Sequence, residues 1–117
     1  MRLMLVVALA LSVIACSKGL DTIESAEAFA KSRGVVLTEK TEDKEQIVAP
    51  RCFDYKGHGA DVRLLQFNSH DAAAEWKKRM DGIPIEPAQR IQSGHIVIEV
   101  RADDDATQQK VVAALQP

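Results

Sequence analysis

The fold of this chain is decided above all by one stretch of sequence, His95-Ile96-Val97-Ile98-Glu99-Val100-Arg101. Its aliphatic side chains recur at every second position, which predicts a β-strand with one buried face and one largely polar face. A second stretch, Asp61 to Phe67, is apolar on both faces, as is typical of a central strand that is covered on both sides. These two segments predict a sheet at the centre of the fold.

Helical patterns surround these strands. Asp21 to Glu24 offers a capping side chain followed by an acid, which predicts the start of a helix. Ser69 and the acidic run Asp103 to Asp105 predict two further helix starts in the same way. Trp76 lies on the buried stripe of the second helix, which Asp81-Gly82 ends. Each helix is therefore expected to pack one apolar face on the sheet.

The remaining segments connect these elements. Val35 to Thr38 begins an extended segment, and the mixed charges of Glu39 to Glu45 indicate a solvated loop or hairpin tip. Gln46 to Tyr55 is predicted to form a strand at an edge or bulge, because it contains a proline, and Lys56 to Gly59 a turn. Ile83 to Pro87 is predicted to be a stiff, extended connection, because a residue that precedes proline avoids the helical region.

The expected order of elements is α-β-β-β-α-β-α, which predicts an α+β fold. We expect a two-layer sandwich, with the helices on one face of a small, mainly antiparallel sheet. A ferredoxin-like arrangement of residues 46–115 is the alternative, although the first helix does not belong to it. Residues 21–117 are predicted to form one small domain.

Composition narrows the class of protein. The chain has 117 residues, a length that fits one domain, with 15 Lys and Arg against 17 Asp and Glu. Its net charge of −2 argues against an extended basic surface for nucleic acid. The 46% hydrophobic content is concentrated in residues 1–15, which leaves enough apolar residues elsewhere for a small core.

The first residues have the features of a secretory signal. Arg2 is followed by the apolar segment Leu3 to Val13, which is shorter than the roughly 20 residues that span a bilayer. At its end, Val13-Ile14-Ala15-Cys16 resembles the lipobox of bacterial lipoproteins: an aliphatic residue, a tolerated residue, a small residue and the cysteine. The alternatives are an ordinary signal peptide with an incidental cysteine and an uncleaved anchor. For residues 21–117 we recognise no family.

The lipobox resemblance implies a lipid anchor. Cys16 would receive diacylglycerol on its sulfur after removal of a signal peptide of residues 1–15, and residues 16–20 would form a lipidated tether. Ser17 follows the cysteine. By resemblance to Gram-negative lipoproteins, this residue favours the periplasmic face of the outer membrane. The lipid bilayer is therefore the first expected partner, and stable attachment follows from several acyl chains.

Lipidation of Cys16 would leave Cys52 without a partner in the chain, since the sequence contains two cysteines. The neighbouring aromatic residues favour a buried structural thiol in a strand. An intermolecular disulfide and a functional nucleophile or ligand are the alternatives. Without lipidation, a disulfide between Cys16 and Cys52 becomes possible.

Few residues suggest catalysis. The histidines at positions 58, 70 and 95 form no metal-ligand pattern, so neither a metal site nor a cofactor is expected. Cys52 together with His58 or His95 is the one enzymatic alternative, because an imidazole can lower the pKa of a thiol.

The function that the sequence favours is therefore that of a membrane-tethered envelope lipoprotein that is not an enzyme and binds an envelope or periplasmic protein. The alternatives are a thiol enzyme that uses Cys52 and a passive structural lipoprotein. An unpaired strand edge near Val35 or Ile47 could accept a partner strand. The individual residues expected to contact the partner are Phe53, Tyr55, His58 and Ile85.

Overall fold

The computed structural model describes residues 19–84 and 87–117. The predictions for the signal segment, for Cys16 and for Ile85 therefore lie outside the described residues. The elements in chain order are α2 (Ile23–Ser32), β1 (Thr38–Glu42), β2 (Arg51–Gly57), β3 (Ala60–Gln66), α3 (His70–Asp81), β4 (Gln89–Ser93), β5 (Ile96–Arg101) and α4 (Asp105–Ala114). No helix in this part of the chain is long and apolar enough to cross a bilayer.

The strands form one five-stranded sheet in the order β1-β2-β3-β5-β4, and every neighbouring pair is antiparallel. β3 lies at its centre, between β2 and β5, as the apolar pattern of that segment predicts. The turn between β2 and β3 is made by His58 and Gly59, which both have positive φ, as a two-residue type I′ hairpin turn requires. The α+β class and the antiparallel sheet are thus confirmed.

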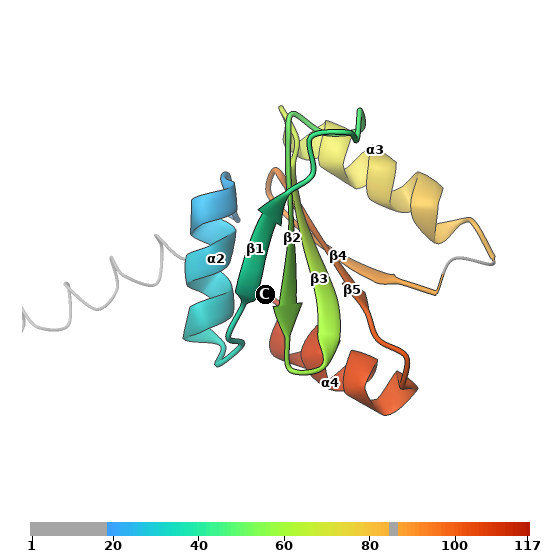
Figure 1. Cartoon of the computed structure of the whole chain (residues 1–117). Coiled ribbons are helices and arrows are strands. Elements are labelled where there is room, and N and C mark those ends of the chain that lie inside the picture. Colours follow the sequence, from blue (N-terminus) through green and yellow to red (C-terminus); the bar gives the residue numbers. More distant parts are fainter. Residues whose placement is uncertain (1–18, 85–86) are drawn as a thin grey trace, which may run out of the picture.

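The two ends of the sheet are built differently. At one end, which we call the Arg51 end, Arg51, Gln66, Ile96 and Ser93 lie side by side across β2, β3, β5 and β4. At the other, the Gly57 end, the turn from β2 to β3 closes the hairpin. In Figure 1 the Arg51 end is uppermost.

Helices cover both faces of the sheet. Neighbouring residues of a strand point to opposite sides, so the core cluster that each strand residue joins shows which helix covers its face. Ile96 and Ile98 belong to a core cluster with residues of α2 and α4, whereas Val97 belongs to a second cluster with Ala73 of α3. Figure 1 accordingly shows α2 and α3 on opposite sides of the sheet. The prediction of a two-layer sandwich with all helices on one face is therefore wrong in this respect, because α3 covers the opposite face.

The helix starts agree with the sequence. The side chains of Thr22, Ser69 and Asp104 each accept a hydrogen bond from a backbone N–H in the first turn of α2, α3 and α4. Such caps satisfy backbone donors that have no partner within the helix. The predictions of all three helices are confirmed.

Two segments of the predicted sheet are placed differently. Thr38–Glu42 forms the edge strand β1, although a solvated loop or hairpin tip is the prediction for residues 39–45. The predicted strand from Gln46 instead begins at Arg51, because the side chains of Asp43 and Gln46 bind backbone groups of residues 45–49 and hold them in a loop. Local side-chain bonds therefore replaced strand pairing there.

The predicted order also lacked one strand. β4 follows the connection after α3, so the order is α-β-β-β-α-β-β-α. Residues 46–115 consequently run β-β-α-β-β-α, which differs from the β-α-β-β-α-β order of ferredoxin-like folds. The ferredoxin-like alternative is wrong for this reason, and because α3 and α4 lie on opposite faces of the sheet.

Candidate functional site

One half of the α3 face of the sheet is left open by the helices. Near the Arg51 end, α3 covers the side chains of Cys52, Leu65 and Val97, which are buried with Trp76 beside them. Towards the Gly57 end the same strands line a groove of about 500 Å³. This charged groove is lined by Glu39, Thr41, Asp54, Tyr55, Lys56, Asp61, Val62, Arg63, Ala88, Glu99 and Arg101.

Ionisable side chains cross the groove in rows of alternating sign. The first row crosses four neighbouring strands, on which residues lie directly opposite one another in the order Asp54, Arg63, Glu99 and Arg90. The Nε atom of Arg63 lies 2.8 Å from Oδ1 of Asp54, and that of Arg90 lies 2.7 Å from Oε2 of Glu99. Opposite charges that face each other across strands stabilise a sheet.

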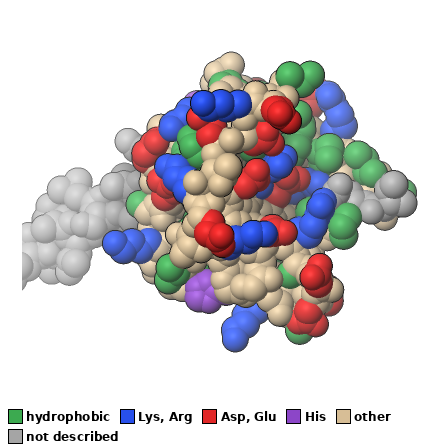
Figure 2. Space-filling model, in the orientation of Figure 1, with side chains coloured by type: hydrophobic (Ala, Val, Ile, Leu, Met, Phe, Trp, Pro, Cys, Tyr) green, Lys and Arg blue, Asp and Glu red, His purple; other side chains and the backbone are tan. Residues whose placement is uncertain are grey.

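A second row lies one pleat nearer the Gly57 end. Here Lys56 is opposite Asp61, with which it forms an ion pair, and Asp61 is opposite Arg101. The side chains of Lys56 and Asp61 are each 60% exposed, so a partner can reach them. Figure 2 shows that acidic and basic side chains are interleaved over the visible face of the molecule rather than gathered by sign.

The charges of the groove are held in place by their neighbours. Burial opposes ionisation of Arg63, but its hydrogen bond to Asp54 and the charge of that carboxylate outweigh burial and raise its pKa. The hydrogen bond to Asp61 likewise raises the pKa of Lys56. Both groups therefore carry their positive charge at neutral pH.

Arg90 lies at the border between the covered half and the charged groove. Its side chain is 1% exposed, and it forms ion pairs with Glu99 and with Asp81 at the end of α3. Its guanidinium also lies 5.6 Å from the ring centre of Trp76. Because a buried charge requires partners, this contact set fixes α3 and β4 against the edge of the groove.

The predicted thiol site is not assembled. Cys52 is 1% exposed, and burial raises its pKa to about 11, so the sulfur is protonated at neutral pH. His58 follows the last residue of the same strand, roughly 20 Å away at the rise of an extended chain. Within the described residues, no hydrogen bond joins Cys52 to His58 or His95.

The predicted partner contacts Phe53 and Tyr55 belong to the core on the α2 side of the sheet, although Tyr55 is also among the residues that line the groove. Tyr55 is buried, and its hydroxyl donates a hydrogen bond to Oε2 of Glu27 at 2.6 Å. Phe53 is half-buried, with the charged groups of Lys40 and Arg51 within 5.4 Å of its ring centre. Both aromatic side chains therefore stabilise the packing of α2 on the sheet.

Among the described members of this predicted set, His58 is the exposed one. Its Nε2 atom accepts a hydrogen bond from the backbone N–H of Val36 at 3.0 Å, which ties the hairpin turn to the chain before β1. Ile85 lies outside the described residues. In the part of the chain that the structure describes, no group of His, Cys, Asp and Glu is arranged to hold a metal ion.

The charged groove was missed from sequence, although it leaves a signal there. Asp54 and Lys56, Asp61 and Arg63, and Glu99 and Arg101 are pairs of opposite charge two residues apart. All of these residues lie on predicted strands except Lys56, which was predicted to begin the turn. Residues two apart share one face of a strand, so each pair marks a charged face.

Comparisons with known proteins give no relative: no family model, no curated protein and no solved structure matches the chain.

Proposed function

We propose that this chain is a lipid-anchored envelope protein that binds another envelope or periplasmic protein and is not itself an enzyme. The lipobox-like sequence Val13-Ile14-Ala15-Cys16 supports acylation of Cys16 and attachment at the periplasmic face of the outer membrane of a Gram-negative bacterium. The charged groove supports the second part of the proposal, the binding of a protein.

The observation that carries the binding role is the incomplete cover of the α3 face. α3 buries the half of this face near the Arg51 end, whereas the charged groove is open and carries ordered rows of both charges. Such a surface suits a protein segment with charges of both signs, because alternating rows favour one register of the partner over others. The exposed pair Lys56 and Asp61 can exchange its mutual contact for contacts with that segment.

The thiol enzyme draws no support from this geometry. A nucleophilic cysteine needs access to solvent and a neighbouring cation or imidazole that lowers its pKa. Cys52 has a raised pKa and is buried beneath α3. A passive structural lipoprotein is the outcome that the following experiments distinguish from a binding protein.

The anchor is tested by labelling cells that express the full chain with a radioactive fatty acid. We expect label on the protein, release of residues 1–15, and fractionation with membranes. Cys16→Ser should abolish both label and membrane association, because the acyl chains provide the attachment. Membrane association of Cys16→Ser equal to that of the parent protein would contradict the anchor.

The groove is tested by placing a photocrosslinking amino acid at position 56 in cells of the source organism. Position 79 on α3 serves as the control, because Arg79 is equally part of an exposed ion pair, with side chains 71% and 72% exposed, and does not line the groove. We expect one discrete adduct from position 56 and none from position 79. The same spread of adducts from both positions would favour a passive lipoprotein.

Charge reversal sharpens this test. With the photocrosslinking residue at position 41 instead, which is exposed and also lines the groove, Lys56→Asp combined with Asp61→Lys keeps an ion pair but inverts the second row, so we expect loss of the adduct in a folded protein. The matched control is Glu75→Arg combined with Arg79→Glu, which inverts the exposed pair on α3 and should leave the adduct intact. An adduct that survives the groove inversion would show that charge in the groove does not select the partner.

A further inference from the structure

The chain enters the domain at the Arg51 end of the sheet. The carbonyl of Leu20 accepts a hydrogen bond from the N–H of His95 at 2.8 Å, in the turn between β4 and β5. Gly94 in this turn has a φ of +58°, and a Cβ atom there would lie 2.3 Å from the oxygen of Leu20. The glycine is therefore needed for the close approach that fixes the entering chain to this turn.

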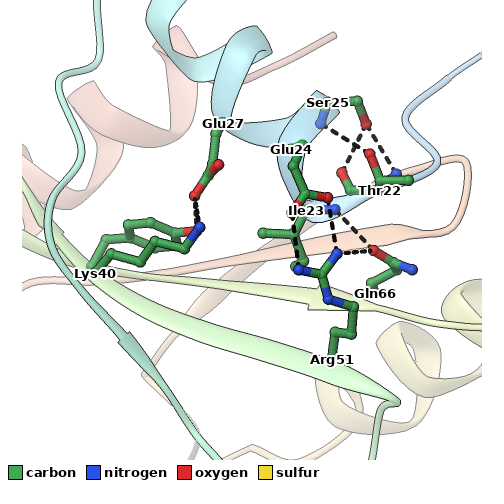
Figure 3. A network of polar contacts seen from close by, with 9 residues as sticks. Thr22, Ile23, Glu24, Ser25, Glu27, Lys40, Arg51 and Gln66 are labelled. Carbon is green, nitrogen blue, oxygen red and sulfur yellow. Dashed lines mark hydrogen bonds and ion pairs between the residues drawn. The ribbon is translucent and has the colours of Figure 1, made fainter.

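A polar network holds the start of α2 at the same end (Figure 3). The backbone N–H of Ile23 donates to Oε1 of Gln66 at 2.9 Å. Both carboxylate oxygens of Glu24 accept hydrogen bonds from the guanidinium of Arg51 at 2.9 Å. Arg51 lowers the pKa of Glu24 to about 2, so this clamp persists throughout the physiological pH range.

The distance from this end to the predicted anchor is short. Gly19 follows Cys16 by three positions in the sequence. Three residues span at most about 11 Å, whatever their conformation, because an extended chain advances by about 3.6 Å per residue. An acylated Cys16 therefore keeps Gly19, and the turn on which it packs, within that distance of the lipid surface.

A loop with exposed apolar side chains projects from the same end of the sheet. Residues 43–50 lead into Arg51, and their loop holds Ile47 at 98% exposure and Val48 at 46%. The loop has a defined shape, because the side chain of Asp43 accepts hydrogen bonds from the N–H groups of residues 45 and 46. Gln46 similarly accepts from the N–H groups of residues 48 and 49 at 2.9 Å.

We propose that the Arg51 end faces the bilayer and that Ile47 and Val48 contact its interface, an orientation that rests on the proposed acylation of Cys16. Single exposed apolar residues are common on protein surfaces, so the short tether carries the inference and the loop supplies the contact. The tether raises the effective concentration of lipid around the loop, so a small apolar contact suffices to hold the orientation.

This orientation points the charged groove away from the membrane. The row of Lys56 and Asp61 lies near the Gly57 end of the strands. β3 has seven residues, so its ends are separated by about 20 Å. A soluble or membrane-bound partner can then approach the groove without displacing lipid.

The test uses tryptophan fluorescence of the acylated protein in vesicles that contain brominated phospholipid, which quenches indole on contact. Ile47→Trp places the probe in the loop. Val36→Trp is the matched control, because Val36 is 64% exposed and is hydrogen-bonded to His58 at the Gly57 end. The signal of Trp76 is measured in the parent protein and subtracted. A mass spectrum of each sample reports whether Cys16 is acylated.

We expect brominated lipid to reduce the emission of the probe at position 47 and to leave that at position 36 unchanged. Acylated protein with equal quenching at both positions, or with quenching at position 36 alone, would overturn the orientation while leaving the anchor intact. A mass without acyl groups on protein from membranes would overturn the anchor, and the orientation with it.

Discussion

Two halves of the same sheet face differ in what covers them. Cys52, Leu65 and Val97 lie beneath α3 in an apolar cluster, whereas Asp54, Arg63 and Glu99 lie on the same strands and the same face, two residues further along. One pleat therefore separates core from open surface. The comparison teaches that one face of a strand can carry core residues at one end and candidate functional residues at the other.

The border between these halves is made by Arg90. Its guanidinium contacts Trp76 on the covered side and Glu99 on the open side. The side chains of Arg90 and Glu99 are consequently 1% and 15% exposed, whereas those of Lys56 and Asp61 in the second row are 60% exposed. The predictions below test this gradient from the covered half to the open half.

The largest effect is expected in the covered half. Leu65→Ala should lower the free energy of unfolding by about 4 kcal/mol, because Leu65 is 1% exposed and its truncation leaves a cavity. Chemical denaturation monitored by circular dichroism gives this value. A loss below about 1 kcal/mol would mean that α3 does not pack on the sheet as described.

The next largest effect on the free energy of unfolding is expected at Arg90, on the border between the two halves. Glu99→Gln removes one charge partner of the buried Arg90 and should cost about 3 kcal/mol of unfolding free energy, since Asp81 still pairs with the guanidinium. The double variant Arg90→Met with Glu99→Leu is the control. It should recover most of the loss, because apolar residues of similar size can replace a buried ion pair. Failure of Glu99→Gln to destabilise the protein would show that Arg90 is solvated.

The reactivity of Cys52 measures how completely α3 shields this half of the sheet from solvent. In the Cys16→Ser variant, a thiol reagent at pH 8 should modify Cys52 at least about 100-fold more slowly than free cysteine, because burial raises its pKa from 9.0 to about 11. Urea should restore the normal rate. Rapid modification of the native protein would revive the thiol enzyme as an alternative.

The same pKa shift makes stability depend on pH at the alkaline end. Between pH 9 and 11 the unfolded thiol loses its proton while the folded thiol keeps it. The folded state then binds more protons, so the contribution of Cys52 to stability falls as the pH rises through this range. Cys52→Ala should remove this contribution, which denaturation curves between pH 8 and 11 would measure.

The smallest effect is expected in the second row of the groove. Lys56→Ala should change the free energy of unfolding by less than about 1 kcal/mol, because the ion pair with Asp61 is exposed on both sides. The same denaturation experiment applies. A loss as large as that of Glu99→Gln would mean that the groove is part of the core rather than an open surface.

The sequence predicts elements better than their arrangement. The strand at Ile96–Arg101 and the three helix starts depend on neighbouring residues, and the structure confirms them, with Thr22, Ser69 and Asp104 as the capping residues. β4 was missed because Gln89–Ser93 is short and mostly polar, and it becomes a strand by pairing with β5. β1 is a polar edge strand for a similar reason: its pairing with β2, rather than its own composition, makes it a strand.

For the candidate site too, the sequence indicates individual residues better than their arrangement. Sequence alone suggested Phe53 and Tyr55 as partner contacts because they lie beside the predicted turn at Lys56 to Gly59. Their position on the α2 side of β2 places them against that helix instead, with Tyr55 bonded to Glu27. The charged pairs of β2, β3 and β5 are visible in the sequence, but they become one groove only when strands far apart in the chain lie in register.

The amino-acid sequence by itself determined the α+β class, the three helix starts and the central strands, because caps and hydrophobic periodicity act between residues close in the chain. It also supplied the lipobox resemblance on which the proposed anchor rests. Only the tertiary structure decided that α3 covers half of one face and that the other half is an open row of charges. That decision depends on strand order and helix placement, which arise from contacts between distant segments.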